Sequence, residues 1–285
     1  MCMKPSNLHI NEEVEKIGSF IKTGLFTLSV ILIAGLAITY SQKKMVTSTS
    51  TMTNGKIHEK ELPIYCVDTD APQIALSFDA AWGNEETQKI LDILNEKEVK
   101  VTFFMTGGWI EKYPNDVKAI AAAGHELGNH SEKHKHMASL SAADCKKEIM
   151  SPHDKVMELT GISMQVFRPP YGEYNDTLIQ TLRECGYHGI QWDVDSLDWK
   201  DYGADSILNT VLKHKNLGNG SIILCHNGAK YTVEALPKLI DGLKEKGYEF
   251  VTMSDLIYDG EYTIDVTGRQ HRKGDDSNTL KKTTN

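Results

Sequence analysis

The chain has 285 residues, of which 40% are hydrophobic and 25% are charged. This composition is typical of a folded globular protein and excludes a largely disordered chain. The length is enough for one or two domains with a full hydrophobic core. The formal net charge is -8, and no long basic stripe occurs. Because nucleic-acid binding depends on clustered Lys and Arg, we expect no nucleic-acid partner.

Residues 1–22 form a short polar segment, and residues 23–40 are uncharged, with the sequence TGLFTLSVILIAGLAITY. These 18 residues just meet the length that a helix needs to cross the hydrocarbon layer. A cleaved secretory signal and a buried core helix are the alternatives. No clean A-x-A site follows the stretch, and the stretch has no polar face. We predict an uncleaved transmembrane anchor at residues 23–40.

Polar segments flank the remaining sequence. Residues 41–62 are rich in Ser and Thr and lack apolar periodicity, which predicts a flexible linker. Residues 267–285 are also polar and are predicted to be a disordered tail. The folded domain is therefore expected to span residues 63–266.

Strand and helix patterns alternate from residue 73 to residue 258. The expected strands are 73–79, 99–105, 125–129, 165–168, 187–192, 221–226 and 249–252. The expected helices are 84–98, 115–123, 141–159, 176–185, 204–214 and 233–246. This alternation predicts a largely parallel sheet with helices outside it. The span is short for eight full strand–helix units, which favours a reduced or distorted barrel, with a doubly wound open sheet as the second choice.

Five cysteines are spread at wide spacings, and no C-x-x-C pair occurs. An odd number with such spacings indicates neither a disulfide framework nor a zinc ribbon. We therefore expect mostly buried, reduced thiols at Cys2, Cys66, Cys145, Cys185 and Cys225.

Polar residues lie at or just after the C-terminal ends of several expected strands: Asp79, His130, Arg168, the segment 193–199 and His226. In barrels and open parallel sheets, this edge is where ligands bind. The sequence therefore predicts that these groups converge on one site.

Asp79 ends the strand QIALSFD and is either a turn or helix-capping residue or a general base at the mouth of a barrel. His130 and His134 are four residues apart in GNHSEKH. On a helical turn, this spacing lets both imidazoles bind one divalent ion. An isolated pair of this kind has low specificity, and the neighbouring His136 adds an ambiguity.

The segment Arg168-Pro169-Pro170-Tyr171-Gly172 is a stiff turn after a strand. It is either a tight surface turn or a functional one. In the functional interpretation, Arg168 holds a carboxylate by a forked contact, and the backbone presents an N–H to a developing oxyanion.

His226 ends the expected strand SIILCH. Because side chains alternate along a strand, Leu224 and His226 share one face and Cys225 points to the other. This argues against a Cys225–His226 nucleophile pair and favours a histidine above a pocket with Leu224 at its floor. A structural histidine is the alternative.

Taken in order, the motifs SFDAAWG, HELGNHSEKH, FRPPYGEYN, WDVDSLDW and SIILCH resemble those of the polysaccharide deacetylase family, the NodB homology domain of carbohydrate esterase family 4. The resemblance covers about residues 72–258, and five ordered motifs are far more specific than any one of them. It implies an α/β fold of the distorted (β/α)7-type barrel. The form SFDAAWG is most similar to the spore-associated, single-aspartate subgroup, which implies a link to sporulation.

The resemblance also implies roles for catalytic residues. Asp79 is the implied catalytic base, and Arg168 is the group that orients it. His226 is the implied general acid, and Asp198 tunes it.

Further residues are implied to contact the substrate. Tyr171 would offer its backbone N–H to the oxyanion, on the turn made by Pro169 and Pro170. Trp199 and Leu224 would shape the acetyl pocket.

The resemblance implies that His130 and His134 bind a divalent metal such as zinc. The family usually has a second consecutive aspartate that binds the metal, and here that position is Ala80. A catalytic zinc usually keeps three protein ligands, so we expect weaker metal binding. Asp195 or His125 is a candidate replacement ligand.

The implied activity is hydrolytic removal of acetyl groups from N-acetylglucosamine or N-acetylmuramic acid units of peptidoglycan, with chitin-like oligomers as the next candidate. The alternatives are a catalytically weak sugar-binding homologue without a full metal site, and an O-acetyl esterase acting on xylan-like glycans. Because the glycan lies outside the cytoplasmic membrane, we expect a single-pass protein of the cell membrane with an extracytoplasmic catalytic domain.

Overall fold

The computed structural model describes residues 51–53, 56–58 and 60–273. The predicted membrane anchor at 23–40 lies outside these residues. Among the helices of the described part, none combines the length and the apolar character that a membrane crossing requires.

The chain divides into two units, residues 1–59 and residues 60–285. In the first unit, β1 (Thr51–Thr53) pairs antiparallel with β2 (Lys56–His58). The part of the chain predicted to be a linker therefore contains a short hairpin.

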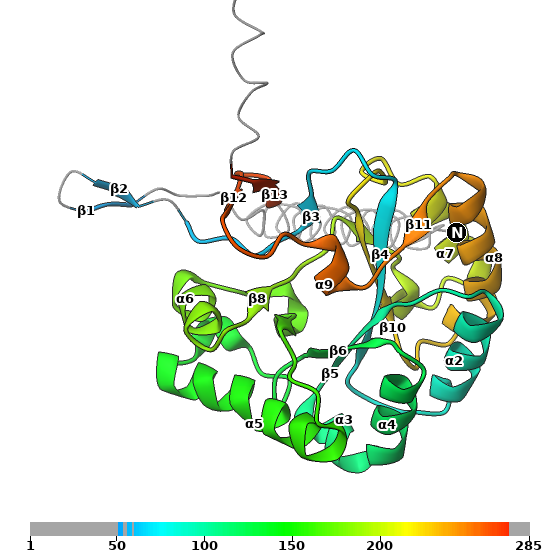
Figure 1. The fold of residues 1–285 in the computed structure, drawn as a ribbon, viewed down its shortest axis with the longest axis horizontal. Helices are drawn as coiled ribbons and strands as arrows, with labels where there is room; N and C mark the ends of the chain where they lie inside the picture. Colours follow the sequence, from blue (N-terminus) through cyan, green and yellow to red (C-terminus); the bar gives the residue numbers. More distant parts are fainter. Residues whose placement is uncertain (1–50, 54–55, 59, 274–285) are drawn as a thin grey trace, which may run out of the picture. The chain divides into compact units, whose positions relative to one another are not determined.

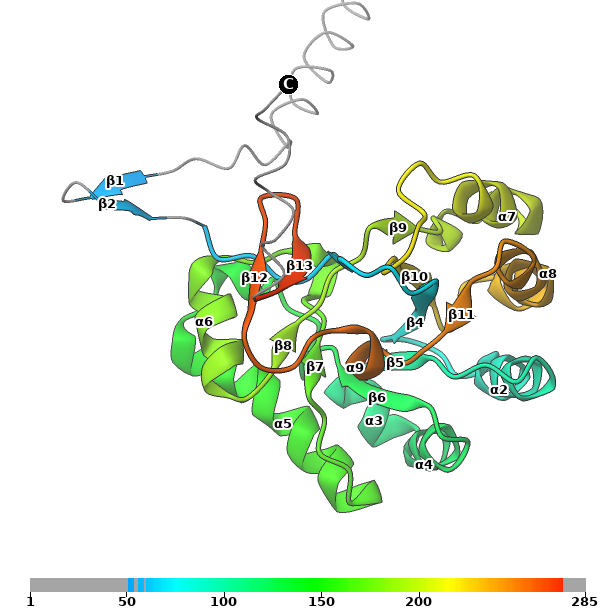
Figure 2. The same cartoon turned by 45° about the horizontal axis from the view of Figure 1, so that its top comes forward.

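The second unit is built on a parallel sheet of eight strands. The strands follow the order β8-β7-β6-β5-β4-β10-β9, and β11 pairs with the start of β4. Their bounds are β4 (Gln73–Ala80), β5 (Thr102–Met105), β6 (Glu126–Asn129), β7 (Val166–Phe167), β8 (His188–Gly189), β9 (Val194–Asp195), β10 (Ile222–His226) and β11 (Glu249–Phe250). The strands curl, and the helices lie along the outside of the curl (Figures 1 and 2).

The helices of this unit connect successive strands. Their bounds are α2 (Thr87–Glu96), α3 (Gly107–Lys112), α4 (Pro114–Ala122), α5 (Ala142–Thr160), α6 (Asp176–Glu184), α7 (Ala204–Leu212), α8 (Thr232–Glu245) and α9 (Met253–Leu256), with 3-10 turns η1 (Met137–Ser139), η2 (Pro170–Gly172) and η3 (Asp198–Lys200). The predicted alternation is therefore confirmed, and the curled sheet fits a NodB-type (β/α) barrel better than a doubly wound sheet. The prediction missed α3, β9 and α9, because elements of two to six residues carry no readable periodicity.

The two ends of the sheet, β8 and β9, are not joined to each other. The chain before β4 lies near this opening, because Ile64 bridges to Ile190 and Cys66 bridges to Ser221. The hydrogen bonding of the barrel is therefore interrupted between β8 and β9, and the segment of residues 64–66 bridges to the chain on both sides of this gap.

A second, smaller sheet has the order β12-β13-β3, with β12 (Tyr262–Ile264), β13 (Arg269–Arg272) and β3 (Cys66–Val67). The prediction of a disordered tail from residue 267 is therefore wrong for β13. Its Gln270 is fully buried, and its side chain donates to the Tyr258 carbonyl and accepts from the Tyr258 N–H. Polar composition concealed this strand, although one of its partners, β12, is the preceding strand; the other, β3, is distant in sequence.

Side chains on β4 alternate between two environments. Leu76, Phe78 and Ala80 belong to the large apolar cluster that the outer helices cover. Ala75 belongs to a second cluster on the other face of the sheet. Because alternate residues share a face, Asp79 points to the inner side of the curl with Ala75.

We predict that Gly128→Ala destabilises the fold. A Cβ at Gly128, in β6, would lie 2.6 Å from Cδ1 of the Phe104 ring, and that ring lies 4.1 Å from the Arg168 guanidinium. Overpacking of this kind costs about 1–3 kcal/mol. Chemical denaturation measures the change in the free energy of unfolding.

Gly108→Ala is the matched control, because Gly108 is the second residue of α3 and the nearest outside atom to an added Cβ lies at 4.0 Å. There the added methyl group is expected to be neutral or stabilising. Equal stability changes in the two variants would contradict the packing argument.

Candidate functional site

Asp79 and His226 stand at paired positions on the neighbouring strands β4 and β10. Adjacent strands are about 4.8 Å apart, so the two residues begin side by side. Asp79 is 6% exposed, and the His226 side chain is 14% exposed. The structure therefore brings the predicted carboxylate and imidazole together at the C-terminal edge of the sheet.

Arg168 makes a buried ion pair with Asp79. It follows β7, and its Nη1 donates to Oδ1 of Asp79 at 2.7 Å and to Oγ of Ser77 at 2.9 Å. Its Nη2 donates instead to the Gln191 carbonyl at 3.2 Å. The predicted forked contact is therefore wrong, since only one guanidinium nitrogen reaches the carboxylate.

This ion pair controls the charge of Asp79. Burial alone would raise the pKa of its carboxyl, but the charge of Arg168, followed by those of His130 and His226, lowers that pKa below 3.8. Asp79 is therefore ionised at neutral pH. Its Oδ1 is occupied by Arg168, and its Oδ2 lies 3.5 Å from Nε2 of His130.

Asp198, at the start of η3, holds His226 from the other side. One carboxylate oxygen accepts from the His226 Nδ1 at 2.7 Å, and the other accepts from the His226 backbone N–H at 2.7 Å and from the Thr232 hydroxyl at 2.7 Å. Because an ionised carboxylate only accepts, Nδ1 carries a proton and Nε2 is the nitrogen left for chemistry. Burial favours the neutral ring, but Asp198 and then Asp79 and Asp195 raise the pKa of His226 above 6.5.

His130 and His134 meet with their ring centroids 4.9 Å apart. They lie on an irregular loop after β6 and not on the predicted helical turn, and His134 has a φ of 52°. The Nδ1 of His130 lies 2.7 Å from the Arg168 carbonyl, which assigns the proton to Nδ1 and leaves a lone pair on Nε2. Burial lowers the pKa of both rings, and that of His134 falls to about 4, with His130 as a further cause.

Two neutral imidazoles are suitable metal ligands, but the described residues contain no group of three His, Cys, Asp or Glu side chains able to hold a metal ion. Asp195 accepts from the Leu197 N–H at 2.8 Å, and His125 accepts from the Val101 N–H at 3.4 Å. Neither candidate replacement completes a three-ligand site. The residues present therefore do not fit the usual zinc site of three protein ligands.

The turn after Arg168 has the expected stiffness. Pro169 and Pro170 are buried, and Tyr171 has a φ of 60°. The exposed Tyr171 ring packs edge-on against His134 and stacks on His136, with centroids 4.6 and 4.4 Å apart. The turn is therefore fixed beside the histidine pair.

Leu224 and Trp199 flank the Asp198–His226 pair. Leu224 is 3% exposed and shares the His226 face of β10, whereas Cys225 lies in the helix-side cluster. Burial raises the pKa of the Cys225 thiol well above 9. Trp199 follows Asp198 directly and is 53% exposed.

Several contributing residues were not predicted. Ser77 bridges the Arg168 guanidinium and the Ile223 carbonyl, and its spacing of two before Asp79 on a strand was the available signal. Thr232 and Gln191 act through hydrogen bonds to groups distant in sequence, which no local pattern reveals.

Positive φ values also gather around the site. Such backbone conformations are costly for residues with side chains and are common at functional sites. Among the non-glycine residues of the described part, positive φ occurs at Ser131, His134, Tyr171, Leu197 and Asp201, all in loops that carry site residues, and at Glu98 elsewhere.

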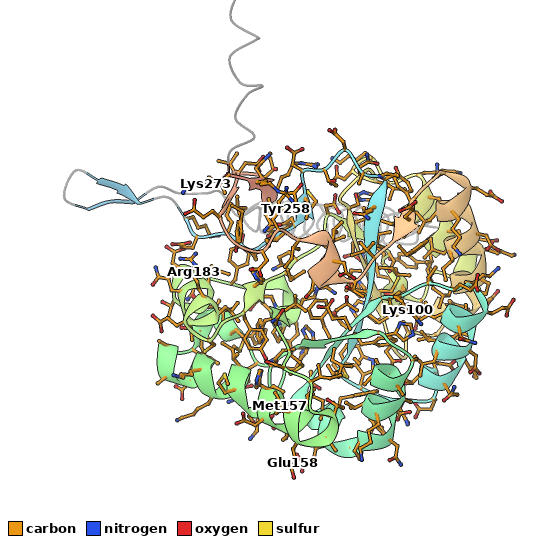
Figure 3. The ribbon with its side chains drawn as sticks, in the orientation of Figure 1. Lys100, Met157, Glu158, Arg183, Tyr258 and Lys273 are labelled. Carbon is orange, nitrogen blue, oxygen red and sulfur yellow. The ribbon has the colours of Figure 1, made fainter. Side chains whose placement is uncertain are left out.

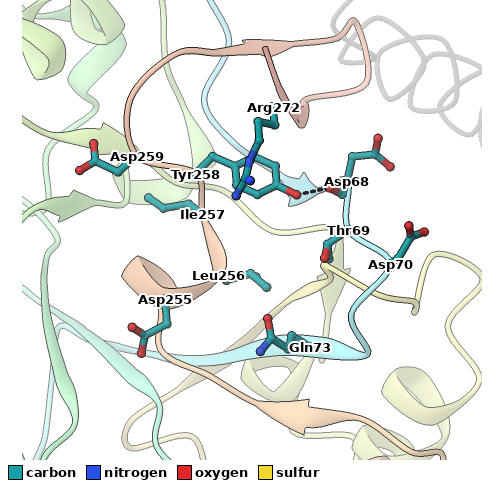
Figure 4. Close-up of a pocket in the computed structure, with 10 residues that line it drawn as sticks. All are labelled: Asp68, Thr69, Asp70, Gln73, Asp255, Leu256, Ile257, Tyr258, Asp259 and Arg272. Carbon is teal, nitrogen blue, oxygen red and sulfur yellow. Dashed lines mark hydrogen bonds between the residues drawn. The ribbon is translucent and has the colours of Figure 1, made fainter. Parts of the chain in front are cut away.

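A separate pocket of about 840 Å³ lies beside the start of β4. The residues that line it include Gln73, Asp68, Tyr258 and Arg272 (Figure 4). Gln73 and Asp79 are six residues apart on one strand, which separates their Cα atoms by roughly 20 Å. None of the predicted site residues lines this pocket.

We predict that Asp198→Asn lowers the pKa of the His226 ring. The amide keeps a hydrogen-bond acceptor but loses the charge that stabilises the imidazolium. Titration of the ring protons by NMR measures the change. His271 provides an internal reference, because its pKa is raised, against partial burial, by Asp265 and Asp68. If neither histidine shifts, Asp198 does not control the charge of His226.

Comparisons with known proteins agree with this geometry. The sequence model of the polysaccharide deacetylase family matches residues 67–190. The chain is 39% identical over 189 residues to a peptidoglycan-N-acetylglucosamine deacetylase of Bacillus cereus, with 65% of this chain and 68% of the relative covered. It is 31% identical to the peptidoglycan-N-acetylmuramic acid deacetylase PdaA of Bacillus subtilis, with 72% and 79% covered.

The fold also matches a solved structure, that of a CE4 family pseudoenzyme from Bacillus anthracis. The TM-score is 0.66 at 31% identity, and the match covers 74% of this chain and 73% of that one. Because the two bacterial relatives align over more than two thirds of their lengths, and the residues matched by the family model include Asp79, His130 and Arg168, the chain belongs to the polysaccharide deacetylase family.

Proposed function

We propose that this protein hydrolyses the acetamide groups of N-acetylglucosamine or N-acetylmuramic acid units in peptidoglycan and releases acetate. The observation that carries the proposal is the pairing of two oppositely charged groups: Asp79, which is held by the cation Arg168, and His226, which is held by the carboxylate of Asp198. The names of the relatives support peptidoglycan as the substrate.

The two groups are suited to opposite proton transfers. Arg168 keeps Asp79 ionised, which makes its carboxylate a proton acceptor at neutral pH. Asp198 keeps His226 protonated to a higher pH, which makes its imidazolium a proton donor. Environments that push two pKa values apart in this way define an acid and a base.

The reaction follows from these charges. A water molecule donates a proton to Oδ2 of Asp79 while its oxygen attacks the acetamide carbonyl carbon. The backbone N–H of Tyr171 stabilises the tetrahedral oxyanion. His226 then passes its Nε2 proton to the sugar nitrogen as the C–N bond breaks, which leaves acetate and a free amine.

Metal use is a separate question, because CE4 deacetylases are generally metal-dependent. A bound divalent ion would polarise the carbonyl and lower the pKa of the water. His130 and His134 are the residues that would hold it. The absence of a third ligand in the described residues supports weak binding, and no step above depends on the ion.

The missing ligand also favours a second candidate function, that of a catalytically weak sugar-binding homologue. The family contains a pseudoenzyme, the protein from Bacillus anthracis described above. An O-acetyl esterase acting on xylan-like glycans is the other alternative, since ester hydrolysis would use the same acid and base.

The cellular setting is proposed from sequence. The apolar stretch 23–40 supports a single-pass membrane protein, and the position of peptidoglycan supports an extracytoplasmic catalytic domain. The motif SFDAAWG supports a role in spore formation.

We predict that Asp79→Asn and His226→Ala each reduce acetate release by about 10²- to 10⁴-fold, because each removes one proton-transfer group. For the wild-type protein, activity falls as pH drops below the lowered pKa of Asp79 and as pH rises through the raised pKa of His226. Mass spectrometry of peptidoglycan fragments measures the loss of acetyl groups.

The same assay on an acetylated xylan separates amide from ester hydrolysis. Circular dichroism verifies that both variants remain folded. Near-full turnover by either variant would refute the assigned roles, and faster acetate release from the ester would favour the esterase.

We predict that Ala80→Asp increases bound zinc. Ala80 is the last residue of β4, and strand register runs from it through Met105 to Asn129, directly before His130. Ala80 is fully buried, so the unliganded carboxylate should also lower the melting temperature, and zinc should restore it.

Ala80→Asn is the matched control, because it has the same shape without the charge. Elemental analysis and thermal unfolding with and without zinc provide the measurements. Equal zinc content in the wild-type protein and both variants would show that residue 80 does not complete the metal site.

A further inference from the structure

Trp82 is a large aromatic side chain that the roles above leave unused. It lies in the turn just after β4, three residues after Asp79, and 55% of its surface is exposed. By contrast, Trp109 is 2% exposed. Tryptophan is usually well buried, because its ring carries a large apolar surface. An exposed indole beside an active site therefore requires an explanation.

The backbone on both sides of Trp82 is fixed. The carbonyl of the next residue, Gly83, accepts hydrogen bonds from the buried Trp109 indole at 2.6 Å and from the Asn227 side chain at 3.5 Å. The Asn227 N–H in turn donates to the Asp79 carbonyl at 2.9 Å. The turn that carries Trp82 is thus connected to the strand ends that carry the proposed base and acid.

A close approach of two turns reinforces this position. Gly228, two residues after His226, has a φ of 96°, and a Cβ there would lie 3.2 Å from the Trp82 carbonyl oxygen. A side chain at this position would crowd the turn. Because Gly228 has no side chain, the segment after β10 packs against the backbone of Trp82.

The Trp82 ring reaches both sides of the site. It stacks nearly parallel to the His226 ring, with centroids 6.3 Å apart and an interplanar angle of 17°. It also lies edge-on to the His134 ring at 6.1 Å. The indole therefore stands at the mouth of the site, next to the proton donor and the histidine pair, with more than half of its surface free.

We propose that Trp82 is a substrate-binding residue whose exposed indole stacks against the apolar face of a pyranose ring and presents the acetamide group of that sugar to Asp79 and His226. The inference rests on the proposed function for the identity of the sugar. Sugar rings have an apolar C–H face, and aromatic side chains in binding sites supply flat apolar contact area. Trp82 follows the base by only three residues, in the turn directly after its strand, so a sugar stacked on Trp82 would lie beside Asp79.

The test measures binding of an N-acetylglucosamine tetramer to the full-length protein by calorimetry. An Asp79→Asn background prevents turnover during the measurement. Trp82→Ala should raise the Kd between about twofold and tenfold, because an aromatic contact of this kind contributes about 0.5–1.5 kcal/mol. Trp82→Phe keeps a flat ring and should stay within about twofold of the parent protein.

Met157→Ala is the matched control, because Met157 is an exposed apolar residue on α5 at the outer surface (Figure 3). It should leave the Kd unchanged. In the Asp79-containing enzyme, Trp82→Ala should raise KM more than it lowers kcat, since stacking acts on the bound sugar and not on proton transfer.

Two results would overturn the proposal: an unchanged Kd in Trp82→Ala, or an equal loss of binding in Trp82→Phe and Trp82→Ala. Its failure is distinguishable from that of the proposed function. If the wild-type protein releases no acetate but Trp82→Ala still weakens sugar binding, stacking by Trp82 holds and the hydrolysis does not. If acetate is released and neither Kd nor KM responds to Trp82→Ala, only the role of Trp82 is wrong.

Discussion

The buried ion pair between Arg168 and Asp79 is the interaction on which the rest of the site depends. Removing two charges from water is costly, and a buried pair is tolerated only where further hydrogen bonds satisfy its remaining atoms. Ser77 and the Gln191 carbonyl provide such bonds, and the Phe104 ring covers the guanidinium. Nε of Arg168 remains without a partner. The pair therefore adds little to stability, but it fixes one carboxylate oxygen and leaves the other free.

The register between β4 and β10 places the proposed base beside the proposed acid. Asp79 and His226 are register partners, and the alternation of side chains places both on the inner face. A shift of one residue on either strand would turn its functional group into the apolar cluster under the helices. The helix-side core, which includes Phe78 and Cys225, therefore specifies the geometry of the site as well as the stability of the fold.

Much of this site was predictable because parallel strands gather their C-terminal ends at one edge. That rule, applied to Asp79, Arg168 and His226, was enough to bring them together. Contacts with backbone groups distant in sequence were not predictable. An example is Nη2 of Arg168, which donates to the Gln191 carbonyl and not to the carboxylate that the sequence suggested. The burial of Gln270 was missed for another reason: the polar composition of its strand resembles that of a disordered tail, and only the fold shows that the Tyr258 backbone satisfies both ends of its amide.

The loss of a carboxylate at position 80 changes what the remaining residues must do. Ala80 is enclosed in the apolar cluster, and its methyl side chain supplies neither charge nor hydrogen bond. Nε2 of His130 and Oδ2 of Asp79 face each other at 3.5 Å, and both are acceptors once Nδ1 holds the histidine proton. Two facing acceptors are unfavourable unless a donor or a cation lies between them. A water molecule that donated to both would satisfy this requirement and would lie beside the base, which would give the site a means of orienting its nucleophile with only two metal ligands.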